Sequence, residues 1–446
     1  MTRGPGHDLD PAAFAGVSTD TRTLAPGQLF VALVGERFDG HAFLEVARDR
    51  GAAMAIVHEG TPDVPGLPLH RVPDTLIAYG ALATRRRRAL PGPVVLVTGN
   101  NGKTTTKEMV AAVLRTRHRV HATRANNNNL VGVPLTILEA PAGTEALVIE
   151  AGGDRPGELP RLFAIAEPDV TVATNATEGH LEGYGSLDAI VADTVACCAG
   201  VRLAVAGLEP PALAEGAARV ARACVAVGWH AGAGPWARAR RPEGVVTDAL
   251  GRPALDLDGH RVQLPLPGLH QALNACFAWE VGRHLGLDGA AMAGALAAVT
   301  VPGGRSELRQ EGGLTILNDC YNANPHSFRA AIATAEALRR GRRLVVIAGT
   351  MRELGADAER LHREVAEALV ALGPDVLALV GEFVPAIAPW RAGLGDRLLV
   401  APDAEAMAPR VAERLRGDEV VVLKGSRGVA LERILPALVA RAHPRP

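Results

Sequence analysis

Short apolar runs alternate with longer amphipathic stretches along this chain, and the alternation predicts an α/β protein. Near the start, apolar runs at 28–34 and 53–57 predict two strands, and a helical stretch around 41–51 separates them. Three further buried strands are predicted at 94–97, 145–150 and 169–174. Because strands that alternate with helices pack as parallel sheets, we expect a parallel sheet with helices on both faces in this central part.

The same alternation restarts after Pro302-Gly303-Gly304 and predicts a third domain. Its strands are predicted at 314–318, 343–348, 375–380 and 419–423. Its amphipathic helices are predicted at about 326–340, 357–372 and 404–416. Before it, residues 230–267 are richer in Gly, Pro and Arg, so we expect a hairpin there that leaves the central sheet, followed by helical structure at 270–299.

A linker is predicted after Arg85-Arg86-Arg87-Arg88, because Pro91-Gly92-Pro93 cannot continue a helix. A polyanion site is one interpretation of four arginines in a row. We expect instead a solvated surface at the carbonyl end of the helix dipole. The chain thus divides into three α/β domains, at 1–89, 90–302 and 303–446.

Composition adds mainly exclusions. The 446 residues carry a net charge of -1, which gives no indication of a nucleic-acid partner. Five cysteines without C-x-x-C spacing argue against a disulfide framework and a structural zinc site, and they fit a reducing cytoplasm. No apolar run approaches the ~20 residues of a membrane span. We therefore expect a cytoplasmic protein with no membrane span, and a monomer by default.

Residues 98–106 (Thr-Gly-Asn-Asn-Gly-Lys-Thr-Thr-Thr) directly follow an apolar run and predict a phosphate-binding loop. A buried strand that ends in a glycine turn and continues as a helix leaves backbone N–H groups pointing at one spot. Lys103 adds a positive charge, and Thr104 adds a hydroxyl for Mg²⁺. The full pattern has a glycine where this chain has Val97, so the loop is a short variant. Its nucleotide contacts are predicted at Gly99, Asn100, Asn101, Gly102, Lys103, Thr104 and Thr105.

Two other predicted strands of this sheet lead to residues with metal-binding chemistry. Glu150 ends one strand, and His180 lies in the loop that follows the next one. Ligands of parallel α/β sheets sit beyond the carboxyl ends of the strands, so both side chains are predicted to face Lys103. A helix cap for the glutamate and a solvated loop position for the histidine are the structural alternatives. The convergence of three strand ends favours a site.

Three loops offer further polar groups. The run Asn126 to Asn129 precedes Gly132-Val133-Pro134 and offers amide donors for a phosphate or a substrate. In the third domain, residues 319–325 follow a strand, and Lys424-Gly425-Ser426-Arg427-Gly428 follow the last strand. The second of these is suited to a carboxylate or a phosphate. Ordinary turn chemistry is the alternative for each loop.

Taken together, these motifs resemble the Mur ligase family over nearly the whole length of the chain. The matching segments are 18–22, 29–33, 35–41, 98–109, 132–136, 179–186, 321–325, 353–355 and 424–428. The Gly-Glu-Arg-Phe-Asp-Gly-His segment at 35–41 and the Tyr-Asn-Ala-Asn-Pro segment at 321–325 point to the branch of the family that adds D-alanyl-D-alanine to UDP-N-acetylmuramoyl-tripeptide.

The resemblance implies an N-terminal domain that holds the UDP end of the substrate, a central P-loop ATPase-like domain and a C-terminal Rossmann-like domain. It also implies ATP and Mg²⁺ as cofactors, an acyl-phosphate intermediate, and two small-molecule substrates in peptidoglycan precursor synthesis. The implied catalytic residues and metal ligands are Lys103, Thr104, Glu150 and His180. Further nucleotide contacts are implied at Asn274, Arg305 and Asp319, and substrate contacts at Asp20, Thr21, Arg22, Asn128, Asn129, Asn324, Lys424, Ser426 and Arg427.

The chain departs from the family pattern near the predicted metal site. The family usually has a carbamylated lysine fourteen residues after the histidine, and this chain has Thr194 there, preceded by Asp193. We therefore expect no carbamate, with Asp193 or a water molecule on Thr194 as its partial replacement. Other departures are Ala125 for a glycine, Leu130 for a glutamate and Thr350 for an aspartate.

Two alternative functions stay open on the sequence. One is a divergent amide ligase of the same fold that joins another amine to another carboxylate. The other is a nucleotide-binding regulatory or scaffold protein whose ligase activity has decayed. Retention of Lys103, Glu150, His180 and Lys424 argues against decay, and retention of the 20–22 segment favours a UDP-linked substrate.

Overall fold

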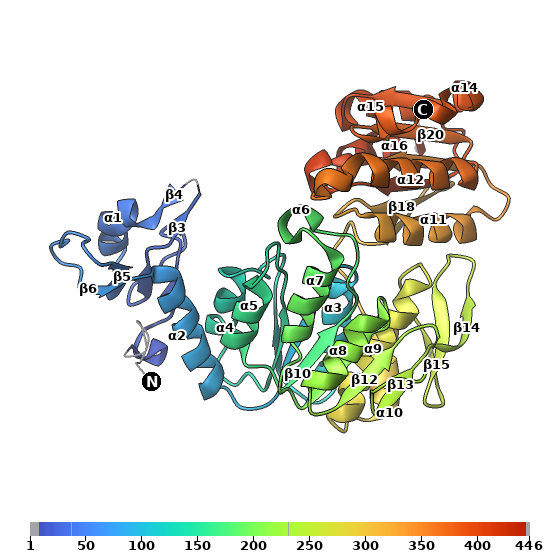
Figure 1. Cartoon of the computed structure of the whole chain (residues 1–446). Helices are drawn as coiled ribbons and strands as arrows, with labels where there is room; N and C mark the ends of the chain where they lie inside the picture. The colour runs from blue at the N-terminus through green and yellow to red at the C-terminus, as the bar shows by residue number, and fades with distance from the viewer. Residues whose placement is uncertain (1–8, 37, 231, 443–446) are drawn as a thin grey trace.

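The computed structural model describes residues 9–36, 38–230 and 232–442, which form three α/β units in chain order (Figure 1). The first unit contains a parallel sheet of four strands in the order β1 (Val17–Ser18), β2 (Leu29–Val31), β5 (Met54–His58) and β6 (Leu69–Val72). The helices η2 (Gly40–Phe43) and α1 (Leu44–Asp49) occupy the predicted helical stretch. A short hairpin, β3 (Val34–Gly35) and β4 (Phe38–Asp39), projects from this unit.

The central unit contains a seven-stranded sheet in which all neighbouring strands are parallel. Its order is β13 (Arg238–Arg240), β12 (Cys224–Val227), β11 (Leu203–Gly207), β10 (Val170–Ala173), β7 (Val94–Thr98), β9 (Ala146–Glu150) and β8 (Val120–Ala122). In β7, Val95 and Val97 pack on one face, while Val94 and Leu96 pack on the other. This alternation explains why the strand is apolar throughout: helices cover both of its faces.

Two groups of helices cover the two faces of the central sheet. One face carries α3 (Lys103–Arg115), α9 (His270–His284) and α10 (Gly289–Ala297). The other carries α4 (Gly132–Leu138), α5 (Glu158–Ala166), α7 (Leu187–Ala196) and α8 (Pro211–Val220). The expected departure from the sheet is a three-stranded antiparallel sheet of β14 (Glu243–Thr247), β15 (Pro253–Leu257) and β16 (His260–Gln263).

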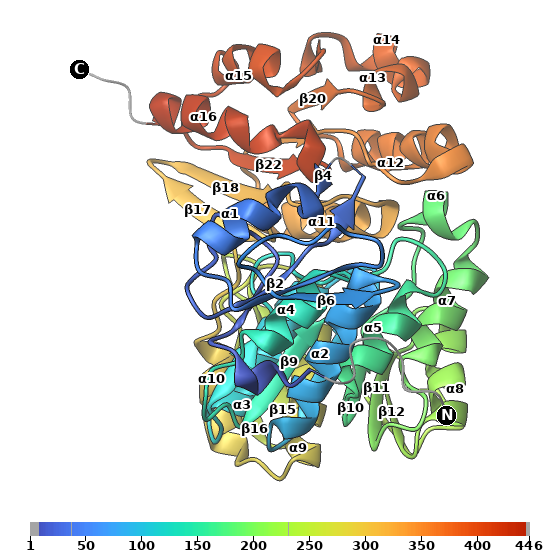
Figure 2. The same cartoon turned by 90° about the vertical axis from the view of Figure 1, so that its left-hand side faces the viewer.

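The third unit contains a six-stranded sheet, parallel except for its first strand. Its order is β17 (Glu307–Glu311), β18 (Leu314–Asp319), β22 (Val420–Lys424), β19 (Leu344–Ala348), β20 (Val376–Val380) and β21 (Leu398–Ala401). One face is covered by α11 (Pro325–Arg339) and α12 (Ala358–Leu372), and the other by α15 (Ala404–Ala412) and α16 (Leu435–Ala442). Figures 1 and 2 show this unit above the central one, with the first unit at the side of the central unit.

Helix α2 (Thr75–Ala89) joins the first unit to the central one. Its Tyr79 packs in the core of the first unit, while Ala83 packs in the core of the central unit. The expectation of a solvated arginine run at its end holds for Arg85 and Arg88, which are exposed, but not for Arg86 and Arg87. Arg87 donates to the backbone oxygen of Glu167 at 2.9 Å and is ion-paired with Asp169 at 3.0 Å. Arg86 also donates to the backbone oxygen of Ala140 at 2.8 Å, so Arg86 and Arg87 fasten the helix to the central unit, while Arg85 and Arg88 remain exposed.

Among the helices of the described residues, none is both long enough and apolar enough to cross a membrane.

Candidate active site

A cavity of about 720 Å³ lies where the central and third units meet. It opens at the carboxyl ends of β7, β9 and β10 on one side and of β18 and β22 on the other. It is lined by most of the site residues predicted from the sequence: Asn100, Asn101, Gly102, Lys103, Thr104, Thr105, Asn128, Asn129, Glu150, His180, Asn274, Arg305, Asp319, Asn324, Lys424, Ser426 and Arg427. Gly99 is adjacent in the chain. Asp20, Thr21 and Arg22 lie in the first unit and do not line this cavity.

The phosphate loop depends on two glycines in the left-handed region. Gly99 has φ +123°, and a Cβ there would lie 2.2 Å from Oγ1 of Thr174. Gly102 has φ +78° and directly precedes α3, and a Cβ there would lie 2.8 Å from Oδ1 of Asn274. Any side chain at either position would strain the backbone and displace its neighbour. Helix α3 begins at Lys103, so its first turn belongs to the loop.

Lys103 bends back over this loop. Its Nζ donates to the backbone oxygens of Gly99, at 2.6 Å, and of Asn100, at 3.3 Å. Burial lowers the pKa of this lysine, and the negative charge of Glu150 opposes that shift. Among the described residues Lys103 forms no ion pair, so the loop presents a cation without a carboxylate partner.

Glu150 is a buried carboxylate that is only half satisfied. It is 2% exposed, and its Oε1 accepts a hydrogen bond of 2.9 Å from Nδ2 of Asn128. Its Oε2 has no hydrogen-bond partner among the described residues. A buried carboxylate oxygen without a partner is costly, and a hard cation satisfies it. Glu150 and the hydroxyl of Thr104, which both line the cavity, therefore offer a donor set that fits Mg²⁺.

The asparagine run has structural partners. The side-chain oxygen of Asn129 accepts from the N–H groups of Val131 and Gly132 at the start of α4, while Asn128 holds Glu150. Their contact with a substrate stays a prediction. Ala125, where the family pattern has a glycine, has φ +52°. The left-handed backbone explains why glycine suits this position.

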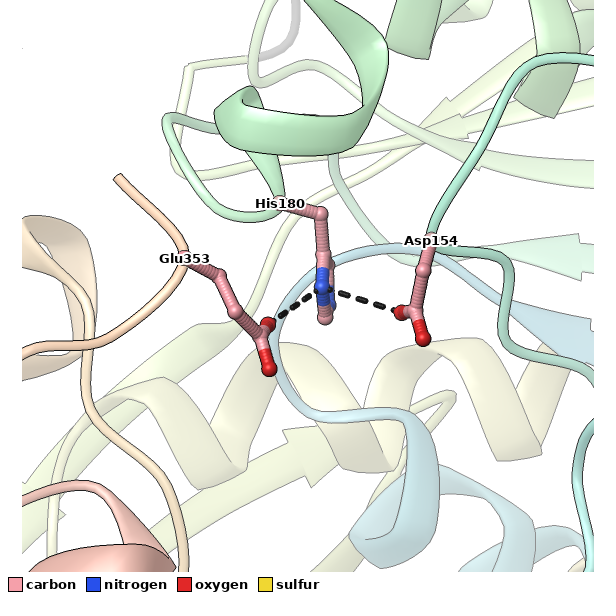
Figure 3. A group of neighbouring side chains, drawn as sticks. All are labelled: Asp154, His180 and Glu353. Carbon is pink, nitrogen blue, oxygen red and sulfur yellow. Dashed lines mark ion pairs between the residues drawn. The ribbon is translucent and has the colours of Figure 1, made fainter. Parts of the chain in front are cut away.

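His180 lies beside two carboxylates from other segments (Figure 3). Its Nδ1 is 2.7 Å from Oε2 of Glu353 and 3.1 Å from Oδ1 of Asp154. The interaction with His180 is the main cause that lowers the pKa of Glu353. Because Glu353 belongs to the third unit, this contact joins two units.

The third unit supplies a second lysine to the cavity. Lys424 ends β22, and its Nζ is ion-paired with Oδ2 of Asp319 at 2.8 Å and donates to the backbone oxygen of Asn322 at 2.7 Å. The other carboxylate oxygen of Asp319 accepts from the N–H of Ser306 at 2.9 Å. Lys424 and Asp319 therefore tie together the loops that follow two neighbouring strands.

Aromatic and amide groups complete this side. Two guanidinium groups lie against the ring of Tyr321, that of Arg305 at 3.4 Å and that of Arg427 at 5.0 Å from the ring centre. Asn324 caps α11 and also donates 2.8 Å across the cavity to Oδ1 of Asn101 in the phosphate loop. These contacts order the loop at 321–325 against the phosphate loop.

Two predicted residues are engaged in local structure. Asn274 accepts from the Thr106 hydroxyl at 3.2 Å and donates to Gln271 at 2.9 Å, which connects α9 to the back of the phosphate loop. In the first unit, Asp20 is ion-paired with Arg22 in the turn after β1. The nucleotide contact of Asn274 and the substrate contact of Asp20 therefore stay predictions.

The structure does not support a metal-binding role for Asp193 or Thr194. Both carboxylate oxygens of Asp193 lie 3.0 Å from the N–H of Gly157, and one accepts from the Tyr184 hydroxyl at 3.1 Å. The Thr194 hydroxyl donates to the backbone oxygen of Ile190 at 2.8 Å. Neither residue lines the cavity, so the expected replacement of the carbamate is wrong in position.

Sequence reasoning did not single out three cavity residues. Asp154 follows Glu150 by four residues, and Glu353 lies in a segment noted only for its family resemblance. His270, at the start of α9, is held with a pKa of about 4 chiefly by burial, so its imidazole is neutral at pH 7. The signal for the first two was their place after strands of predicted parallel sheets.

Models of three Mur ligase domains match the chain in order. They are the "Mur ligase family, catalytic domain" at residues 13–87, the "Mur ligase middle domain" at 97–282 and the "Mur ligase, glutamate ligase domain" at 304–427. A Bacillus subtilis protein named UDP-N-acetylmuramoyl-tripeptide–D-alanyl-D-alanine ligase is 34% identical, with 95% of this chain and 93% of that protein covered. The chain belongs to the Mur ligase family.

Other Mur ligases agree with this placement. An Escherichia coli protein with the same name is 33% identical over 95% of this chain and 93% of its own length. The crystal structure of MurF ligase from Thermotoga maritima in complex with ADP superposes with a TM-score of 0.86 at 28% identity, covering 98% of this chain and all of that one. MurF from Acinetobacter baumannii gives a TM-score of 0.85 at 26% identity, covering 95% and 93%. The three-unit α/β architecture predicted from the sequence is thereby confirmed.

Proposed function

We propose that this protein is an ATP-dependent ligase that joins D-alanyl-D-alanine to UDP-N-acetylmuramoyl-tripeptide in peptidoglycan precursor synthesis. One observation carries the proposal: the phosphate loop with Glu150 and His180 faces Lys424 and Arg427 across a single cavity. A nucleotide-binding half and a half suited to the carboxylate of a second substrate thus share one space. The names of the relatives supply the substrates.

The reaction needs both halves because a carboxylate is a poor electrophile. Transfer of the γ-phosphoryl group of ATP to the terminal carboxylate of the tripeptide gives an acyl phosphate and ADP. The amine of D-alanyl-D-alanine then attacks the acyl carbon, the C–N bond forms, and phosphate leaves with the electrons of the broken C–O bond while the amine loses a proton. Holding the two substrates together makes this attack effectively intramolecular.

The chain's own groups have distinct tasks in this proposal. The N–H groups of the loop and Lys103 hold the phosphates and oppose the charge of the transferred group. Asn274, Arg305 and Asp319 contribute further nucleotide contacts. Thr104, Glu150 and His180 would hold Mg²⁺, which would neutralise charge on the phosphoryl group.

The two substrates are assigned to different units of the chain. We assign the UDP end of the first substrate to Asp20, Thr21 and Arg22 in the first unit, and further contacts of this substrate to Asn128 and Asn129, which line the cavity. The amine substrate is assigned to Asn324, Lys424, Ser426 and Arg427. The guanidinium of Arg427 suits the free carboxylate of a dipeptide, while Lys424, ion-paired with Asp319, keeps this loop in place.

Three broader expectations accompany this function. We place the domain boundaries at 1–89, 90–302 and 303–446, supported by three main sheets that each fall within one range. A cytoplasmic location is supported by the free cysteines, all of them buried thiols. A monomer is the working oligomeric state, because one chain brings both halves of the cavity together.

The decisive test is phosphate release with ATP, Mg²⁺, UDP-N-acetylmuramoyl-tripeptide and D-alanyl-D-alanine. Release should require both substrates, and Lys103→Ala should reduce it at least about 10³-fold, because it removes the cation beside the transferred group. Turnover with other amines but not with this dipeptide would indicate a divergent ligase. Nucleotide binding without turnover on any amine would indicate decayed activity.

A further inference from the structure

Three ionisable side chains from three separate segments converge at the edge of the cavity (Figure 3). Asp154 lies in the loop after β9, His180 directly precedes α6 (Leu181–Tyr184), and Glu353 lies in the loop after β19 of the third unit. One ligand atom from each, two carboxylate oxygens and an imidazole nitrogen, all lie within 4.8 Å of one another. The two carboxylates approach the same ring from opposite sides in Figure 3.

An ion pair alone does not account for this arrangement. The Nδ1 of His180 is close to both carboxylates, yet neither contact has the direction of a hydrogen bond, and the buried nitrogen has no hydrogen-bond partner among the described residues. A single N–H can serve only one of two such acceptors well. The two carboxylate oxygens and the imidazole nitrogen are instead close enough together to surround one ion.

A second observation concerns Glu150, which lines the same cavity. Its side chain is 2% exposed, and its Oε2 has no hydrogen-bond partner among the described residues. The cavity therefore holds a buried, unsatisfied carboxylate oxygen in addition to the three converging groups. Buried anionic oxygens of this kind are usually paired or coordinate a metal.

The distances suit a divalent cation. Ligands about 2.1 Å from an octahedral ion are about 3.0 Å apart when adjacent and about 4.2 Å apart when opposite. The contacts of 2.7 Å and 3.1 Å are close to the separation of adjacent ligands, and the three atoms all lie within 4.8 Å of one another. One imidazole with two carboxylates suits Mn²⁺ better than Mg²⁺, which prefers an all-oxygen shell.

We propose that Asp154 and Glu353, together with the His180 already assigned to Mg²⁺, complete a divalent-cation site that bridges the central and third units. The two carboxylates provide the negative charge that Thr194 cannot supply, since its hydroxyl is turned to the backbone of its own helix. A cation held by groups from both units stabilises their closed arrangement. Its catalytic use rests on the proposed function, but its existence does not.

The test is Mn²⁺ binding to the full-length, nucleotide-free chain, measured by electron paramagnetic resonance. Wild type should bind saturably, and Asp154→Asn and Glu353→Gln should each weaken this binding at least tenfold because each removes one ligand. The matched controls Asp188→Asn and Glu367→Gln remove exposed acids from the same two units and should bind as wild type does. Removal of bicarbonate should leave the affinity unchanged, because no carbamate is needed.

A second measurement separates loss of a ligand from misfolding. Circular dichroism in EDTA should give all variants the wild-type spectrum, and Mn²⁺ should raise the melting temperature of wild type and controls but not of Asp154→Asn or Glu353→Gln. Equal Mn²⁺ affinity in wild type and both ligand variants would overturn the site, as would the absence of saturable binding. Since no substrate is present, a failure of the proposed ligase reaction would leave these results intact and distinguishable.

Discussion

The two lysines of the cavity follow strand ends in two different sheets, yet their surroundings differ. Lys103, after β7, contacts only backbone oxygens, and its pKa is lowered by burial. Lys424, at the end of β22, has a side chain that is 3% exposed and is ion-paired with Asp319. One cation is left for a ligand, while the other is neutralised within the protein.

The carboxylates of Glu150 and Asp319 also differ in whether the protein satisfies them. Glu150 in the central unit keeps one oxygen without a hydrogen-bond partner among the described residues, whereas both oxygens of Asp319 in the third unit are engaged. The central unit thus carries unsatisfied charge, which favours ligand binding over stability. The third unit uses its charges to hold loops in place. Residues of the same type at equivalent strand ends therefore need different experiments to reveal what they do.

Glu150→Gln should separate function from stability most clearly. The change removes a cation ligand and should lower kcat about 10³-fold, equivalent to about 4 kcal/mol. It should leave the unfolding free energy unchanged or higher, because a buried, half-satisfied carboxylate becomes neutral. Phosphate release and denaturant unfolding measure the two quantities.

The exposed Glu139 at the end of α4 offers the matched control. Glu139→Gln makes the same chemical change outside the cavity and should alter neither quantity. If Glu150→Gln lost several kcal/mol of stability, Glu150 would belong with the structural charges of the third unit, and the comparison between the two halves would break down.

Asp319→Asn should show the opposite balance. It leaves the buried ammonium of Lys424 without its counter-charge, and breaking a buried pair in this way costs about 3 kcal/mol. The unfolding transition of the third unit should shift accordingly. In a double-mutant cycle, adding Lys424→Met should restore part of the loss, because the unpaired charge is removed. Additive losses from the two changes would show that the pair does not hold these loops.

The phosphate loop could be predicted from sequence because its signal is local. Nine consecutive residues, 98–106, contain the turn glycines, the lysine and the helix start, and the strand before them is apolar on both faces. Glu150 and His180 were placed in the cavity by a general rule, that ligands gather at the carboxyl ends of parallel strands. To apply this rule, it was enough to know which apolar runs are strands.

The contacts between units could not be predicted in this way. Asp154 and Glu353 meet at His180 although they are far apart in the chain and lie in different units, and no periodic pattern encodes that meeting. The prediction that the arginines at the end of α2 are solvated failed at Arg87 for the same reason. A polar helix end predicts exposure when the helix is considered alone, but Arg87 finds Asp169 once α2 packs against the central unit.

His270 gives the smallest predicted effect, at the place where the two halves meet. It is half-buried at the start of α9, and burial lowers its pKa to about 4, with Asp319 opposing the shift and Lys424 adding to it. The unfolded chain therefore binds a proton more readily between pH 6.5 and about 4, so the stability contribution present above pH 6.5 is lost as pH falls through this range.

In His270→Gln this loss should be absent. Relative to the variant, wild type should lose about 2 kcal/mol of unfolding free energy across that range, measured by denaturant unfolding at a series of pH values. His230→Gln, which alters an exposed histidine, should follow the wild-type curve. If His270→Gln also followed it, His270 would be solvated in solution, and the boundary between the two halves would be more open than the cavity implies.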